Sequence, residues 1–373
     1  MLLNREIMMI DSKYRNKNLQ VFNNDNVVTE GWYWALQSKE LKTGKAKPVR
    51  LSGKDLAIFR TESGKVVAMD AYCPHRGAHL AGGTVEGEAL RCYYHHWKFN
   101  EKGKCVDVPC LKKAPKAEVS TYPAEDHYGL IWVWVGQGKP HELPIVPDLE
   151  GHDVDVTFAK PYVKNCHPNI VMSDAIDVQH FRSVHRIPGN ILHIEGKKVN
   201  DNTLRYDNVA AMPTDTIIGR LLAPFYKTQL TYSLCYWGGC AGSVTVGPDF
   251  QRYHIIYANR LGDNGVSEGQ VILLTKRSKN VLGRMYGKAL LGATRIVSDY
   301  FANGDTPQFD SINFDFKTPI KDDKTILTFM SHVEGLPVAD WGFSKPNKID
   351  SVDLSPAFSS NRKQTEGEAC TIS

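Results

Sequence analysis

Hydrophobic and polar positions divide the chain into two parts of different character. In the first part, strand-like runs begin at Trp32, Ala57 and Val66, and turns containing glycine and lysine separate them. Short strands bounded by such turns are typical of all-β domains, so we expect one over residues 28–140. Residues 1–27 are polar and rich in asparagine, which predicts an N-terminal arm.

A segment rich in proline and glycine, residues 136–147, precedes a longer part that mixes strands and helices. Predicted strands cover Thr203–Ala210, Gln229–Tyr236, Ser243–Val246, His254–Asn259 and Gly269–Thr275, and predicted helices cover Val171–His185, Leu282–Phe301 and Asp305–Phe316. Thr325–Met330 is expected to close the sheet. These elements predict an α+β domain over residues 141–350, with helices packed on one antiparallel sheet. Residues 351–373 predict a loose tail.

Composition agrees with a soluble two-domain protein. The chain has 373 residues, a formal charge of +4 and 42% hydrophobic residues, so no nucleic-acid partner is implied. Apolar runs such as residues 130–135 are far shorter than the ~20 residues that span a bilayer, and no export signal is evident. The eight cysteines are too few for a secreted disulfide scaffold, so we expect reduced thiols and a cytoplasmic location.

The first candidates for chemistry are two short motifs, sixteen residues apart, each with one cysteine and one histidine: Cys73-Pro74-His75 and Cys92-Tyr93-Tyr94-His95. Two thiolates and two imidazoles are the ligands of a [2Fe-2S] cluster in which histidines replace two cysteines on one iron. Zinc also takes this set, but zinc fingers group cysteine with cysteine and histidine with histidine. Each motif follows a strand-like run, so two hairpin tips are expected to hold the cluster.

A second candidate site lies in the segment that contains Asp177, His180 and His185. Two histidines and a carboxylate on one face of a metal leave the opposite positions open for O2 and substrate, as in non-haem Fe(II) oxygenases. His180 and His185 are five residues apart, roughly 140° around an ideal helix, so a straight helix cannot aim both at one ion. We therefore predict a wide turn or a helix break between them.

The third ligand must then be a carboxylate further along the chain, and the region after Ser298 offers four: Asp299, Asp305, Asp310 and Asp315. Asp174 also lies close to the histidines in sequence, but a solvated acid on a helix face is its simpler interpretation.

The motifs resemble the Rieske domain of the ring-hydroxylating oxygenase family. The resemblance rests on Cys73-Pro74-His75-Arg76-Gly77, the turn Gly82-Gly83, Trp97 and the strand Tyr128–Val133. The family usually reads Cys-Pro-Tyr-His-Gly-Trp at the second motif, so Tyr93 and His96 are departures. The two-residue gap favours His95 over His96 as ligand.

The resemblance extends to the family's Asp-x-x-His-x-x-x-x-His motif. It implies that His180 and His185 bind iron and that Asp177 bridges the two redox centres, in family trimers towards His95 of a neighbouring subunit. Members that act on steroids and sterols place the third ligand in Asp-x-x-x-aromatic-x-x-Lys, which Asp310 fits, with Asp315 as the second choice.

The implied function is a terminal oxygenase that hydroxylates, demethylates or desaturates a hydrophobic small molecule, as a monooxygenase, with a [2Fe-2S] cluster, mononuclear Fe(II) and O2. Because Gly-x-Gly-x-x-Gly is absent, a separate NAD(P)H-dependent reductase or ferredoxin must supply electrons. Such an acidic partner is expected to contact Arg76, Arg91 and Lys98. A homotrimer without a membrane span is expected. The alternative is a Rieske electron-transfer protein with a degenerate second metal site.

Overall fold

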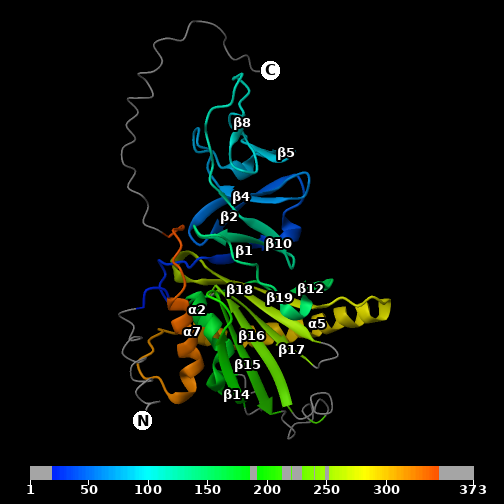
Figure 1. Cartoon of the computed structure of the whole chain (residues 1–373), viewed down its shortest axis with the longest axis vertical. Helices are drawn as coiled ribbons and strands as arrows, with labels where there is room; N and C mark the ends of the chain where they lie inside the picture. Colours follow the sequence, from blue (N-terminus) through cyan, green and yellow to red (C-terminus); the bar gives the residue numbers. More distant parts are fainter. Residues whose placement is uncertain are drawn as a thin grey trace.

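The computed structural model describes residues 19–184, 191–211, 229–238, 240–247 and 252–343, together with Arg220. Its architecture is mostly antiparallel β-sheet with few helices, as predicted. Figure 1 shows small sheets at one end of the molecule and one large sheet with its helices at the other. His185 and the C-terminal residues from 344 onward lie outside the described residues.

Three small sheets build the first part of the chain. They have the strand orders β1-β11-β10, β2-β3-β4-β9 and β5-β6-β7-β8, and every pairing is antiparallel. The strands are β1 (Gly31–Gln37), β2 (Lys45–Leu51), β3 (Lys54–Arg60), β4 (Val66–Asp70), β5 (Thr84–Glu86), β6 (Ala89–Arg91), β7 (Lys98–Phe99), β8 (Cys105–Asp107), β9 (Thr121–Tyr122), β10 (Ala124–His127) and β11 (Leu130–Val135). All six side chains of β11 are buried because this strand is paired on both edges and covered on both faces.

One large antiparallel sheet dominates the second part, in the order β12-β19-β18-β17-β16-β15-β14, with β13 also paired to β19. Its strands are β12 (Val154–Phe158), β13 (Tyr162–Lys164), β14 (Ile191–Lys198), β15 (Thr203–Ala211), β16 (Gln229–Trp237), β17 (Ala241–Val246), β18 (Tyr253–Leu261) and β19 (Ser267–Lys276). The five strands predicted between residues 203 and 275 are therefore confirmed, while β12, β13 and β14 had not been predicted.

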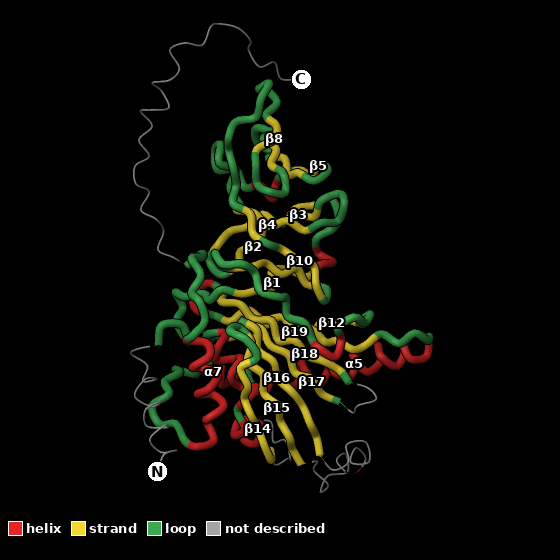
Figure 2. The backbone as a smooth tube through the Cα atoms, viewed as in Figure 1, coloured by secondary structure: helices red, strands yellow, loops and turns green. Residues whose placement is uncertain are grey.

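The helices are α2 (Pro168–Ser173), α3 (Val178–Ser183), α5 (Val281–Gly304), α6 (Thr306–Phe309) and α7 (Lys324–Glu334). Figure 2 shows that they lie mainly beside the large sheet. The strand predicted at residues 325–330 is wrong, because this segment belongs to α7. Its apolar residues Ile326, Phe329, Met330 and Val333 recur with helical spacing and are buried on one face.

The predicted helix over residues 305–316 is also wrong, because α6 ends at Phe309. Beyond it, Phe314 leaves the helical path and packs against the ring of Phe22, with 5.3 Å between the ring centroids. Among the described residues, no helix combines the length and apolar character needed to cross a bilayer.

The two parts of the molecule share a hydrophobic core. Trp132 on β11 packs with Ile256 on β18 and with Ile272 and Leu274 on β19. The guanidinium group of Arg260 donates hydrogen bonds to the carbonyl oxygens of Trp34 and Ala35 at 3.1 and 3.0 Å. The small sheets are therefore packed against β18 and β19 of the large one.

The last described residues return to the small sheets, since Trp341 is buried in the same core as Leu51 and donates its indole N–H to the Leu51 carbonyl. The segment that follows α7 thus stabilises the first part of the chain, although the sequence places it in the second domain.

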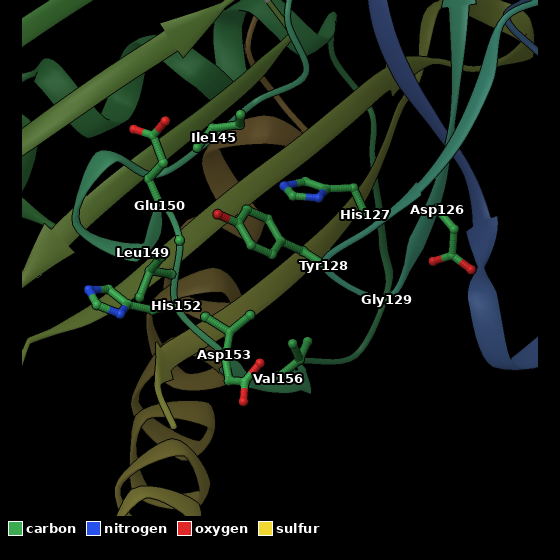
Figure 3. A pocket seen from close by; sticks show the side chains of 12 residues that line it. Asp126, His127, Tyr128, Gly129, Ile145, Leu149, Glu150, His152, Asp153 and Val156 are labelled. Carbon is green, nitrogen blue, oxygen red and sulfur yellow. The ribbon is translucent and has the colours of Figure 1, made fainter. Parts of the chain in front are cut away.

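A cleft of about 520 Å³ opens where the β10–β11 turn meets the segment before β12 (Figure 3). His127, Glu150, His152 and Asp153 are among its lining residues. None of the predicted metal ligands lines it, so the candidate sites lie elsewhere.

Candidate metal centres

The loop that contains the first Cys-x-His motif is closed by two backbone hydrogen bonds. The N–H of Cys73 donates to the carbonyl of Ala78 at 2.9 Å, and the N–H of Gly77 donates to the carbonyl of Cys73 at 2.9 Å. Gly77 has φ of +74°, a left-handed conformation that glycine adopts without steric cost. The sequence places a glycine where this turn requires one.

The second loop repeats this pattern with different residues. The N–H of Cys92 donates to the carbonyl of Trp97 at 2.9 Å, and the N–H of His96 donates to the carbonyl of Cys92 at 3.2 Å. His96 therefore occupies the position equivalent to Gly77, and it has φ of +59°. A non-glycine residue in this region carries backbone strain, so the departure at His96 has a structural cost.

The two loops bring equivalent side chains together. Both cysteines are buried in one hydrophobic core, and burial, together with the neighbouring Cys92, raises the pKa of the Cys73 thiol to about 11. The rings of His75 and His95 lie 4.5 Å apart, and His75 stacks on Trp97 at 4.6 Å. The arrangement offers a buried pair of sulfur ligands and an outer pair of imidazole ligands, which suits one iron for each pair.

The second candidate site lies at a break in the helical segment before the large sheet. α2 is followed by a short 3-10 helix (Asp174–Ile176), which ends at Asp177; this residue is extended and begins α3. The carboxylate of Asp177 accepts hydrogen bonds from the N–H groups of Gln179 and His180 at 2.8 and 3.1 Å, so it is an N-cap. α3 ends at Ser183, between the two predicted histidine ligands, as the spacing required.

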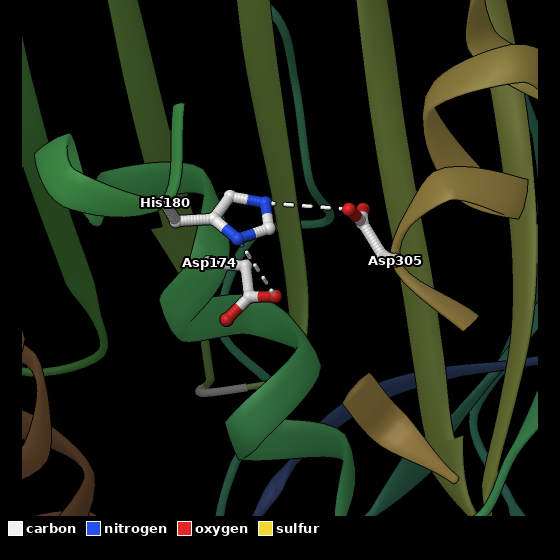
Figure 4. Close-up of side chains that lie close together, drawn as sticks. All are labelled: Asp174, His180 and Asp305. Atoms are coloured by element: carbon white, nitrogen blue, oxygen red, sulfur yellow. Dashed lines mark ion pairs between the residues drawn. The ribbon is translucent and has the colours of Figure 1, made fainter. Parts of the chain in front are cut away.

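The side chain of His180 lies between two carboxylates (Figure 4). Its Nε2 atom is 3.3 Å from Oδ1 of Asp305, and its Nδ1 atom is 4.0 Å from Oδ2 of Asp174. Ligand atoms of these three residues all lie within 4.8 Å of one another. Gln308 joins the group, because its amide donates to Asp174 at 2.6 Å and lies 3.4 Å from Nδ1 of His180. The group can hold one metal ion.

Burial and mutual charge shift the pKa values in this group. Burial raises the pKa of Asp174 to about 7, and the His180 charge opposes that shift. For His180, burial lowers the pKa, but the hydrogen bond to Asp305 and the charges of both acids outweigh it, so the pKa lies above the usual value. The negative charge of the two carboxylates thus favours a proton on the imidazole of His180. The same negative charge would attract a metal cation to this position.

A buried lysine holds Asp305 in place. Lys164 donates from Nζ to the carbonyl of Ala302 at 2.8 Å and to the hydroxyl of Thr306 at 2.5 Å. These two contacts join the end of α5 to the start of α6, and Asp305 stands at the corner between them. The side chain of Asp305 makes no capping hydrogen bond to α6, so its carboxylate is directed to His180.

The structure does not bring Asp310 to His180. Asp310 is exposed and follows the last residue of α6, whereas the sequence placed it at the head of a helix. The other two acids form ion pairs. Oδ2 of Asp299 lies 3.9 Å from Nε of Arg295, and Oδ2 of Asp315 lies 2.5 Å from Nζ of Lys317. Of the four acids that the sequence offered, Asp305 is the one within the metal-binding group.

Asp174 is also placed differently from the prediction. Its side chain is 19% exposed rather than solvated, and it faces His180. A signal for Asp305 is present in the sequence: Gly304 and Pro307 interrupt the helical pattern around it, and an acid at such a break can face inward.

Comparison with known proteins bears on both centres. Residues 31–123 match the family model described as the Rieske [2Fe-2S] domain. This chain contains a Rieske domain. The oxygenase subunit of 3-chlorobenzoate-3,4-dioxygenase from Comamonas testosteroni is 37% identical over 195 residues, which cover 48% of this chain and 42% of the relative.

The oxygenase component of 3-ketosteroid-9-alpha-monooxygenase from Rhodococcus rhodochrous is 29% identical over 176 residues, which cover 45% of this chain and 47% of the relative. The chain thus matches less than half the length of either relative. NdmB of Pseudomonas putida CBB5 has the same fold, with a TM-score of 0.61 and 18% identity, over 84% of this chain and 92% of that one.

The surface of the Rieske domain differs from the predicted basic patch. Arg91 and Lys98 both bind the carboxylate of Glu86, at 2.9 and 2.8 Å. Arg76 lies 6.0 Å above the ring of Tyr94. Of the three predicted contacts for an acidic electron donor, Arg91 and Lys98 therefore share one acid, which offsets one of their two positive charges.

Proposed function

We propose that this protein is a terminal oxygenase that receives electrons at the Rieske domain and uses O2 at a second, mononuclear iron site. One observation carries the proposal: the chain holds a surface pair of imidazoles, His75 and His95, and a separate group of one buried imidazole and two partly exposed carboxylates. An electron carrier needs the first site alone. The second offers the donor types that non-haem oxygenases use.

The donor set fits a divalent iron. We assign His180, through Nε2, and Asp305 as ligands, with His185 from the segment that follows α3. When bound, Fe(II) would supply open coordination positions and redox chemistry for the activation of O2. The chain's own residues set the geometry: Lys164 fixes the corner that carries Asp305, and Asp174 with Gln308 faces Nδ1 of His180. Such contacts fix the tautomer and orientation of a ligating imidazole.

We propose that electrons pass between two copies of the chain. Figure 1 shows β5 and β8 at one end of the molecule and α2, which precedes His180, beyond β1, β2 and β4. The histidine pair follows β4 and β6, so it belongs to the far end. We propose a homotrimer in which His95 of one subunit meets Asp177 of the next. Asp177 is partly exposed, and its backbone cap holds the carboxylate beside His180.

The substrate we propose is a hydrophobic small molecule. Tyr257 is partly buried close to Asp305, and burial followed by the charge of Asp305 raises its pKa to about 12. Phe309, two per cent exposed, begins the apolar core beyond the same corner. A relative named for a ketosteroid supports a polycyclic substrate, with hydroxylation, demethylation or desaturation as the possible outcomes.

The test is turnover with a surrogate reductase, 18O2 and a substrate panel that includes ketosteroids, sterols and chlorinated benzoates. We expect a product that has gained labelled oxygen, lost a methyl group or lost two hydrogens, and about three irons per chain. Reduction of the cluster with about two irons per chain and no product would contradict the proposal, and it would instead support an electron carrier.

A further inference from the structure

The outward face of α5 is apolar, which is the reverse of an ordinary surface helix. Five large apolar side chains on this helix are exposed: Val281 (62%), Leu282 (79%), Met285 (63%), Tyr286 (55%) and Ile296 (73%). Ala289, Gly292 and Ala293 lie between them and are also exposed. From the helical repeat, these positions share one broad side of α5. Between Val281 and Ile296 that side carries no charged residue, and Asp299 lies on the same side three residues beyond Ile296.

The opposite side of α5 packs on the large sheet. Gly287, Leu291, Thr294 and Ser298 are buried, and their spacing of four, three and four residues defines one face. Leu291 packs with Leu273 of β19. The small contact residues bring the helix close to the sheet, so the outer apolar face cannot turn inward. A contiguous exposed apolar face on a helix marks an interaction surface.

The charge around residues 281–296 is predominantly positive. From residue 269 to residue 298 the chain has no aspartate or glutamate, and it has six basic residues: Lys276, Arg277, Lys279, Arg284, Lys288 and Arg295. Arg277 pairs with Asp155 and Arg295 lies near Asp299. Lys279, Arg284 and Lys288 are exposed, and no acid in the part of the chain that the structure describes pairs with them.

The outer face of α5 is accessible to a large, flat partner, and basic residues lie along one flank of it. Arg284, Lys288 and Arg295 recur at spacings of four and seven residues, so they form a stripe along one flank of the apolar face. Figures 1 and 2 show that the start of α5 extends past the edge of the sheet beside β12. An apolar face flanked by a basic stripe is the pattern of helices that lie in the interface of an anionic membrane.

We propose that the outer face of α5 binds the surface of an anionic phospholipid bilayer. Leu282, Met285 and Ile296 insert among the acyl chains, and Arg284 and Lys288 contact the phosphate groups. The helix lies parallel to the membrane, because its other side is fixed to β19. The proposal is independent of the proposed oxygenase function, since neither metal centre takes part in it.

The test is co-sedimentation of the full chain with vesicles of phosphatidylcholine alone and of an equimolar mixture with phosphatidylglycerol. We expect binding to the mixed vesicles, weakening as salt is raised, and little binding to phosphatidylcholine. Replacing both cations, Arg284→Gln with Lys288→Gln, should weaken the binding roughly 30-fold, because each cation near the surface contributes about fivefold. Leu282→Ser with Met285→Ser should weaken it roughly tenfold or more.

Matched controls show whether binding depends on the outer face of α5 or on any exposed positive charge or apolar side chain. Lys112→Gln with Lys113→Gln removes the same net charge from an exposed site in the Rieske domain, and Val199→Ser removes an apolar side chain that is 59% exposed. Both should bind as the parent does. Equal binding by the α5 variants and the parent would overturn the proposal. So would an oligomer that dissociates on Leu282→Ser with Met285→Ser while no form binds the vesicles, since the face would then contact a second copy.

Discussion

Replacing Asp305 with asparagine gives the sharpest test of the second metal centre. The substitution Asp305→Asn would keep the size of the side chain and the corner that Lys164 fixes, but it would remove the negative charge 3.3 Å from Nε2 of His180. Substitutions that only support a ligand cost about 10–100-fold in metal affinity. Loss of a ligand itself should lower the Fe(II) affinity by at least the upper end of that range, which is about 100-fold, or about 2.7 kcal/mol of binding free energy.

The assay is anaerobic titration with Fe(II), with iron content measured in parallel. Asp310→Asn is the matched control, because it removes the same charge from an exposed site five residues on, and its affinity should stay within about threefold of the parent. In the metal-free protein, Asp305→Asn should also lower the pKa of His180, because the Asp305 hydrogen bond raises it. NMR titration of the imidazole measures this shift. Equal Fe(II) affinity of the two variants, or greater loss at Asp310, would refute the assignment.

Further predictions concern stability. Gly83→Ala should destabilise the Rieske domain by about 1–3 kcal/mol, because an added Cβ would lie 2.0 Å from the Arg91 carbonyl oxygen; thermal unfolding followed by cluster absorbance measures it. His96→Gly should leave stability unchanged or raise it by up to about 1 kcal/mol, since relief of the strain at φ of +59° offsets the entropy of glycine; a clear loss on denaturation would contradict this. Asp177→Ala should cost about 1 kcal/mol through the lost cap of α3, and Asp177→Asn should restore most of it in the same melting experiment. Burial lowers the pKa of His254 to about 4, and an unfolded histidine titrates near 6.5, so the unfolded chain binds the extra proton between these values. The free energy of unfolding should therefore fall by up to about 3 kcal/mol as pH drops from about 6.5 to about 4, and His254→Gln should flatten that part of the profile.

Local sequence was sufficient wherever short-range pattern decides the outcome. Alternating apolar positions located the strands between residues 203 and 275, and helical periodicity located α5. The two motifs of one cysteine and one histidine could be found because both candidate ligands of each loop lie within a few residues, and the loop itself sets their spacing. The same argument placed a helix end between His180 and His185.

Other features depended on contacts that no local pattern contains. The strand predicted at residues 325–330 was wrong for another reason, because the spacing of Ile326, Phe329, Met330 and Val333 already matches one face of a helix. Which of the four downstream acids lies beside His180 also depends on contacts between distant parts of the chain. A motif favoured Asp310, but packing of the α5–α6 corner around Lys164 directed Asp305 to His180.

The sequence by itself therefore determined the ligand types, the first metal centre and most of the strands, because each depends on neighbours along the chain. The tertiary structure decided which distant acid lies beside His180, that Asp174 is only partly exposed and faces His180, and that the apolar side of α5 faces outward. These depend on where separate elements pack, and the side-chain direction at a corner or on a helix is fixed only once its partner surface is in place.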